Sequence, residues 1–99
     1  MANDDPAMPL PQTRVYPNPF SDVVNIKVSP HTSALLSAGI YNLKAQRVKS
    51  LPIANLANQE QSLIWDGSDQ NGRKVGNGIY YLHLMDGSRV SKHKILYIR

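Results

Sequence analysis

The segment from Trp65 to Tyr80 constrains the fold of this chain more than any other stretch. It begins with the only tryptophan and contains four glycines, two aspartates and two asparagines before apolar residues return at Ile79. Glycine and asparagine tolerate positive φ, and Asp and Asn side chains bond to nearby backbone groups. The segment therefore predicts two tight reversals, joined by a bridge at Arg73–Val75, between two strands. Trp65 is predicted to plug the core at this corner.

A calcium-binding loop is the alternative interpretation of the same residues. Such a loop needs oxygen ligands at alternate positions, a glycine at position six and a glutamate at position twelve. If Gly72 is position six, positions one and twelve fall on Gly67 and Gly78, which carry no side-chain oxygen. A turn is therefore favoured over a metal site, and Asp66 and Asp69 are expected to cap backbone N–H groups.

Length and composition limit the chain to one domain with one core. It has 99 residues, of which 41% are hydrophobic, and it has no cysteine for a disulfide or a thiolate metal site. No apolar run approaches the roughly 18–20 residues that span a bilayer, and Met1–Leu10 does not have the pattern of a signal peptide. We therefore expect either a cytosolic chain or the end of a longer exported protein. The net charge of +4 is too dispersed to predict nucleic-acid binding.

Short apolar stretches separated by turn residues predict an all-β protein. Turns are expected at Asn42–Gln46 and at Asp86-Gly87, a pair typical of a two-residue hairpin loop. About seven strands, with turn signals roughly every 8–12 residues and no ordinary helix, predict an immunoglobulin-like antiparallel β-sandwich. The expected strands are Val15–Tyr16 at an edge, Val23–Ser29, Ala38–Leu43, Gln46–Ser50, Glu60–Asp66, Gly78–Asp86 and Val90–Arg99. Ser33–Ala38 is expected to be a loop.

Alternation of apolar and polar residues predicts the face of each strand. Phe20, after a turn at two prolines, is expected to tuck into the core as an apolar stop. In the last strand, Leu96 and Ile98 are expected to face inward. In the strand Val23–Ser29, one face is expected to carry Val24, Ile26 and Val28. In the strand Gly78–Asp86, one face is expected to carry Tyr80, Leu82 and Leu84.

No residues form a recognisable catalytic group. The three histidines lie in separate segments, and none belongs to a nucleophile motif with a serine or an acid. We therefore expect a non-catalytic domain without a cofactor. Tyr81 and Tyr97, with Met85, could form a strip that stacks on sugars, but packing on the sheet surface is favoured for residues of such high β-propensity.

Three segments, in this order and spacing, resemble a known family. They are Tyr16–Phe20, Trp65–Tyr80 and Lys94–Arg99. Together they resemble the C-terminal sorting domain of the type IX secretion system of Bacteroidetes, and the middle segment also resembles the immunoglobulin-like domain of the flagellar hook-capping protein. Ala45 stands where the family usually has glycine. The motif residues are Pro17, Asn18, Pro19, Phe20, Trp65, Asp66, Gly67, Asp69, Gly72, Gly78 and Tyr80.

The resemblance implies a proline-rich linker over residues 1–13 and an immunoglobulin-like sorting domain over residues 14–99. It implies an N-terminal cargo that crosses the inner membrane by its own signal peptide, and an outer-membrane translocon that recognises the domain. A surface sortase-like peptidase would cut in the linker and can join the cargo to anionic lipopolysaccharide at the cell surface. The implied recognition residues are Lys94, Ile95, Leu96, Tyr97, Ile98 and Arg99.

Two other functions fit the same sequence. The domain could be a structural module of a hook-cap-type or other extracellular assembly, or a carbohydrate-binding accessory module. The position of Arg99 at the end of the chain favours the sorting signal, because the family carries its address there.

Overall fold

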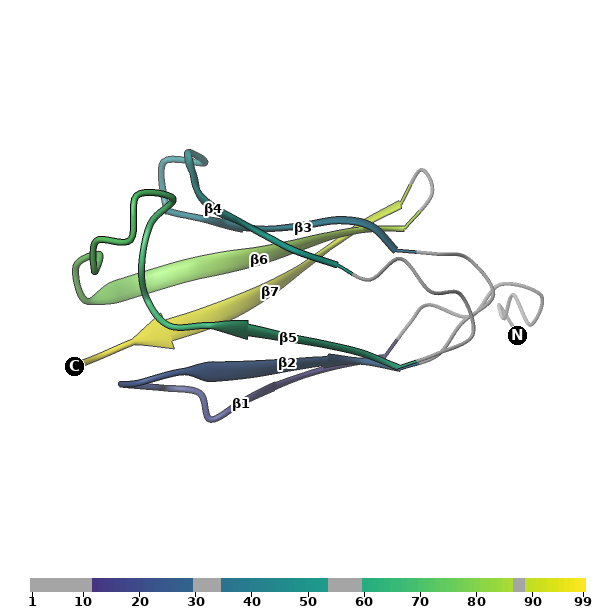
Figure 1. Cartoon of the computed structure of the whole chain (residues 1–99), viewed down its shortest axis with the longest axis horizontal. Coiled ribbons are helices and arrows are strands. Elements are labelled where there is room, and N and C mark those ends of the chain that lie inside the picture. Colours follow the sequence, from purple (N-terminus) through teal and green to yellow (C-terminus); the bar gives the residue numbers. More distant parts are fainter. Residues whose placement is uncertain (1–11, 30–34, 54–59, 87–88) are drawn as a thin grey trace, which may run out of the picture.

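The computed structural model describes residues 12–29, 35–53, 60–86 and 89–99. These residues form strands and loops without a helix, and therefore include no helix that could cross a membrane. Two antiparallel sheets have the strand orders β1-β2-β5 and β4-β3-β6-β7 (Figure 1). The predicted antiparallel sandwich is confirmed. Its strands are β1 (Thr13–Tyr16), β2 (Val24–Val28), β3 (Leu35–Tyr41), β4 (Arg47–Leu51), β5 (Gln61–Trp65), β6 (Gly78–Asp86) and β7 (Arg89–Tyr97).

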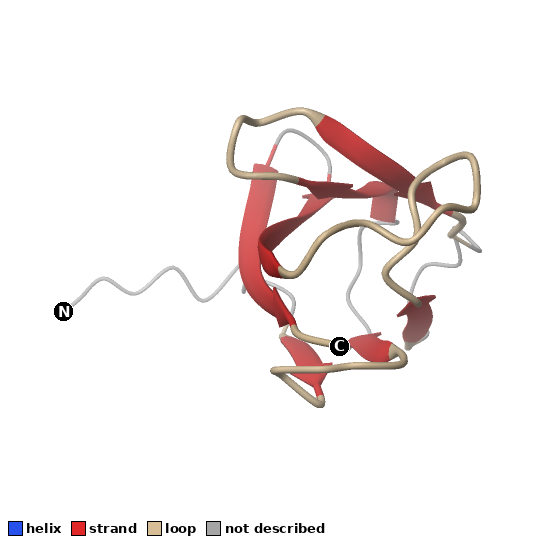
Figure 2. Cartoon of the chain, turned by 90° about the vertical axis from the view of Figure 1, so that its left-hand side faces the viewer, coloured by secondary structure: helices blue, strands red, loops and turns tan. Residues whose placement is uncertain are grey.

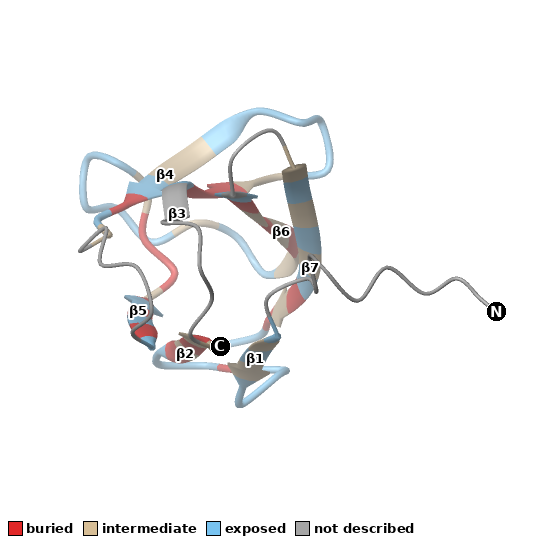
Figure 3. Cartoon of the chain, turned by 90° about the vertical axis from the view of Figure 1, so that its right-hand side faces the viewer, coloured by how far each residue is buried: buried red, intermediate tan, exposed pale blue. Residues whose placement is uncertain are grey.

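The core lies between the two sheets. An end view shows the two layers with loops joining them (Figure 2), and the buried residues lie on strands of both layers (Figure 3). In β2 and β5, buried residues alternate with accessible ones, and the pairing sets Ile26 opposite Leu63. The two predicted sets of three residues are all buried. They are Val24, Ile26 and Val28 in β2 and Tyr80, Leu82 and Leu84 in β6.

Several predicted boundaries differ from the structure. β3 begins at Leu35, so part of the segment expected to be a loop belongs to a strand. Thr13, placed in the linker by the sequence, is the first residue of β1. Asp86 pairs with Arg89 and is therefore the last residue of β6, while its predicted turn partner Gly87 lies outside the described residues. The rest of the predicted linker, residues 1–11, is also outside them.

The predicted orientation of β7 is wrong. Ile95 and Tyr97 are fully buried, whereas Ile98 is 49% exposed and Leu96 is only partly buried. Residues directly opposite each other in an antiparallel pair share a face, and Ile95 lies opposite the inward-facing Tyr80. The apolar run from Ile95 to Ile98 has candidates for both faces, so alternation within β7 alone does not fix the register.

The turn between β3 and β4 forms as predicted, although it has alanine in place of glycine. The Asn42 Oδ1 atom accepts hydrogen bonds from the backbone N–H groups of Lys44, at 2.9 Å, and Gln46, at 3.0 Å. Ala45 has a φ of 63°, in the left-handed region. This conformation costs an L-residue roughly 1–2 kcal/mol, so the Asn42 side chain stabilises a turn that the positive φ of Ala45 disfavours.

Ala45→Gly is expected to raise the free energy of unfolding by about 0.5–1 kcal/mol. Glycine removes the strain of the positive φ but loses more chain entropy on folding. Urea denaturation measures the difference. Lys44→Gly is the control, because Lys44 has no positive φ and glycine there should destabilise the protein. A lower stability for Ala45→Gly would contradict the strain.

Candidate functional site

Three segments far apart in the sequence meet in one buried aromatic cluster. The ring of Phe20 stacks on that of Tyr97, with centroids 4.7 Å apart, and lies 5.4 Å from the ring of Trp65. The Trp65 and Tyr97 rings are 5.9 Å apart, and the Tyr80 ring meets Trp65 edge-on at 5.3 Å. None of the four side chains is more than 8% exposed. The predicted burial of Phe20 and Trp65 is confirmed.

The hypothesis of an exposed aromatic strip that includes Tyr97 is wrong. Tyr97 has no exposed surface, because its position opposite Gly78 in β6 turns its ring inward against Phe20. Tyr81 lies on the other face of β6 and is partly accessible. The two tyrosines therefore cannot contact one sugar together.

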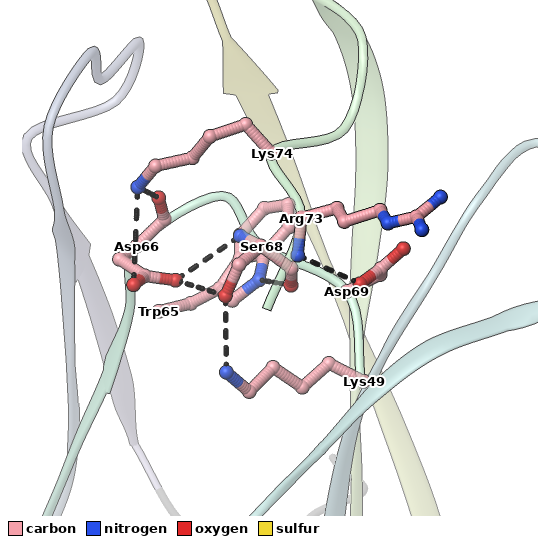
Figure 4. A network of polar contacts seen from close by, with 7 residues as sticks. All are labelled: Lys49, Trp65, Asp66, Ser68, Asp69, Arg73 and Lys74. Carbon is pink, nitrogen blue, oxygen red and sulfur yellow. Dashed lines mark hydrogen bonds and ion pairs between the residues drawn. The ribbon is translucent and has the colours of Figure 1, made fainter. Parts of the chain in front are cut away.

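The loop after Trp65 is fixed by a polar network (Figure 4). The Trp65 Nε1–H group donates a hydrogen bond of 2.8 Å to the Ser68 carbonyl, and Asp66 accepts bonds from both the backbone N–H and the hydroxyl of Ser68. Lys49 donates to the Ser68 hydroxyl at 3.1 Å, and Lys74 donates to the Asp66 carbonyl at 2.6 Å. The hydrogen bond from the Ser68 hydroxyl, opposed by partial burial, holds the pKa of Asp66 below its ordinary value. The network supports Trp65 from outside the core.

The next turn is held by Asp69. Its Oδ1 atom accepts hydrogen bonds from the backbone N–H groups of Asn71, at 2.9 Å, and Arg73, at 3.0 Å. The expected capping by both aspartates is therefore confirmed. The predicted pair of reversals is instead one closed turn, flanked by a bridge between Ser68 and Lys74. Within the described ranges, no group of three or more His, Cys, Asp or Glu residues could hold a metal ion.

Gly67 leaves room for the Tyr97 side chain. A Cβ atom on Gly67 would lie 2.5 Å from the Tyr97 Cζ and 2.7 Å from its hydroxyl oxygen, and the φ of Gly67 is +81°. Both the backbone conformation and the contact exclude a side chain there. The middle segment, through Gly67, and the closing segment, through Tyr97, therefore fit together at this contact.

The first segment covers the outer edge of β7. The Phe20 N–H donates to the Leu96 carbonyl at 3.0 Å, and the Ile98 N–H donates to the Phe20 carbonyl at 2.9 Å. The Asn18 side-chain amide continues this pattern: it donates to the Lys94 carbonyl and accepts from the Leu96 N–H, both at 2.9 Å. Backbone groups that an edge strand would offer to another chain are therefore already paired from Lys94 to Ile98.

Gln70 covers the opposite edge of the same sheet. Its backbone N–H donates to the Val48 carbonyl at 3.0 Å, and its side-chain carbonyl accepts from the Ser50 N–H at 2.9 Å. No sequence pattern indicated this role, because a glutamine in a turn has no preferred partner. Both sequence motifs thus act as edge caps of the four-stranded sheet.

The six predicted recognition residues do not form one exposed strip. The structure brings Ile95 and Tyr97 into the core and leaves Leu96 partly buried. Lys94, Ile98 and Arg99 are exposed, and the Arg99 N–H donates to the Asn77 side chain at 3.1 Å. Only three of the six side chains are exposed at this end of the sandwich.

Comparison with protein families now identifies the domain. The family model described as secretion system C-terminal sorting domain matches residues 14–98. The chain belongs to this family. Sorting domains of this family are non-catalytic, and they direct cargo of the type IX secretion system. The predicted family and sorting role are confirmed.

A solved structure has a similar fold. It is described as the crystal structure of dimeric latent PorU from Porphyromonas gingivalis, and the match has a TM-score of 0.67 at 19% sequence identity. The match covers 90% of this chain but only 9% of the PorU chain, so the likeness concerns the fold of one part of that protein. A comparison with curated proteins finds no match.

Gly67→Ala is expected to destabilise the sorting domain by at least about 3 kcal/mol. Part of the loss is the positive φ, roughly 1–2 kcal/mol, and the rest is the overlap with Tyr97. Gly72→Ala is the matched control, because Gly72 has a φ of +84° but nothing within 4 Å of its added Cβ. Equal losses for the two variants in urea denaturation would contradict the role of Tyr97.

Asn18→Ala is expected to lower the free energy of unfolding by about 1–2 kcal/mol, since it removes two exposed hydrogen bonds to β7. Hydrogen exchange locates the effect: the Leu96 amide should exchange faster. Asn25→Ala, which removes one bond of 3.3 Å on the other sheet, serves as the control. Unchanged exchange at Leu96 would rule out the edge cap.

Proposed function

We propose that the translocon in the outer membrane reads exposed side chains near the end of β7 and just after it, namely Lys94, Ile98 and Arg99. Two of them are cationic and one is apolar, so together they offer charge and an apolar contact to a receptor. Asn18 and Phe20 occupy the neighbouring backbone edge. Recognition would therefore use these side chains on a rigid strand rather than the addition of a receptor strand.

The observation that carries this proposal is the contrast between buried and exposed residues in the closing segment. Ile95 and Tyr97 hold the strand on the core, where they have no exposed surface, while Ile98 remains 49% exposed. An exposed apolar side chain between two cations is a feature that a partner surface can recognise. The core contacts of Ile95 and Tyr97 hold the backbone that carries these three side chains.

We further propose the course of export that the family suggests. An N-terminal cargo precedes the sorting domain and is either delivered to the cell surface or secreted. A sortase-like peptidase at the surface cuts within the predicted linker, before β1 begins at Thr13. The boundary between linker and domain lies near residue 14, where the family match begins.

Surface display of a reporter tests the recognition residues. The chain is fused to the C-terminus of a reporter that is exported to the periplasm of a bacterium with a type IX system. In the variant, serine replaces Lys94, Ile98 and Arg99. Because all three side chains are exposed, the fold should persist while display falls by at least about tenfold, the factor for a loss of ~1.4 kcal/mol in binding. Deletion of Lys94–Arg99 is less informative, because it removes two core residues.

The matched control replaces three residues of the same types on the other sheet. Arg14, Lys27 and Ile64 lie on β1, β2 and β5, and Ile64 is 60% exposed. Their replacement by serine should leave display near the wild-type level. Normal display of the Lys94, Ile98 and Arg99 variant would refute the proposal, as would an equal loss in the control.

A further inference from the structure

An aromatic pair stands on the outer face of the four-stranded sheet. The rings of Tyr41, at the end of β3, and His83, in β6, are stacked with centroids 4.1 Å apart and an angle of 19° between their planes. Gly39 allows this arrangement, since a Cβ atom there would lie 3.2 Å from the Tyr41 ring. Gly39 is the direct neighbour of His83 in the sheet. The missing side chain therefore lets the tyrosine ring lie along the sheet.

Two shallow hollows adjoin this aromatic pair, and both are lined by Tyr41 and His83. The first has a volume of about 160 Å³ and extends toward Arg47, Ser50 and Met85. The second has a volume of about 190 Å³ and extends toward Leu43, Tyr81 and Lys92. Each is smaller than the roughly 300–1,000 Å³ of an ordinary small-molecule pocket. Each hollow therefore has the size for one ring of a ligand rather than for a whole cofactor.

Each hollow has one cation and, among the described residues, no carboxylate. Arg47 lines the first and Lys92 the second. Neither has an ion-pair partner in the part of the chain that the structure describes. Burial, and after it the positive charge of Lys92, lowers the pKa of His83. The charge of Lys92 thus acts at the aromatic pair itself, where an anion would be attracted.

We propose that this face binds a linear acidic oligosaccharide, with sugar rings in the two hollows. The apolar C–H face of a sugar ring packs against partly exposed aromatic rings, here Tyr41 and His83. Carboxylates on successive sugars accept hydrogen bonds from Arg47 in one hollow and Lys92 in the other, and the arginine fork suits a carboxylate. A uronic-acid chain supplies these features at repeated intervals.

An acidic peptide fits this face less well. An extended peptide gains most of its affinity by pairing with a sheet edge. Gln70 occupies part of one edge of this sheet, and Asn18 with Phe20 occupies part of the other. The face has shallow hollows around aromatic rings, and these hollows favour the rings of a sugar chain over the backbone of a peptide. This binding surface does not depend on the proposed recognition residues Lys94, Ile98 and Arg99.

Calorimetric titration of the 99-residue chain with tetragalacturonate tests the proposal at low salt. We expect saturable binding that weakens as salt is added, and no detectable binding of the neutral maltotetraose. Arg47→Gln and Lys92→Gln should each weaken binding at least about fivefold, the size expected for one charge-assisted hydrogen bond. His83→Ala, which removes half of the aromatic pair, should weaken it as well.

Lys27→Gln is the matched control, because it removes the same charge from β2 in the other sheet. It should leave the affinity unchanged, and thermal unfolding should show all variants folded. Tetraglutamate provides the acidic-peptide comparison. The proposal is overturned by the absence of tetragalacturonate binding, by equal affinity for tetraglutamate or maltotetraose, or by an equal loss in Lys27→Gln. These outcomes are independent of surface display, so the proposed sorting residues stand or fall separately.

Discussion

The stacking of Phe20, Trp65 and Tyr97 is the interaction on which the rest of the sorting domain depends. Each ring comes from a different segment, and each is almost completely buried. A buried aromatic side chain contributes on the order of 1.5–3 kcal/mol through its apolar surface, and ring pairs add about 0.5–1.5 kcal/mol. The cluster joins the three-stranded sheet, which contributes Trp65, to the four-stranded sheet, which contributes Tyr97. The motifs that identify the family are therefore first of all the parts of one core.

The second constraint is the protection of sheet edges. Sandwich domains leave strand edges that can pair with other chains, and proteins protect them with loops or charges. Here the two loops that carry the family motifs pair with both edges of the four-stranded sheet, partly through the side-chain amides of Asn18 and Gln70. This pairing limits how a receptor can use β7. Over the segment from Lys94 to Ile98, the recognition that we propose would therefore rest on exposed side chains, which can be varied without loss of the strand.

Sequence patterns were sufficient for the architecture but not for the closing strand. β6 was predicted to the residue because Tyr80, Leu82 and Leu84 occupy alternate positions between Gly78 and Asp86. Trp65 and Phe20 were predicted as core residues because a large aromatic side chain beside a turn is stabilised mainly by burial of its apolar surface. The orientation of Ile95 and Tyr97 could not be predicted, since it depends on the pairing with β6. The Tyr41–His83 pair could not be predicted either, because the two residues are adjacent only across strands and over a glycine.

The bridge between Phe20 and Tyr97 links positions near the opposite ends of the described chain. Closing so long a loop costs chain entropy before the contact is gained, and contacts of this kind slow folding. A chain that emerges from a pore one end at a time cannot complete this corner until both segments have passed. The finished aromatic corner therefore forms only when both of these distant segments are present and free to meet.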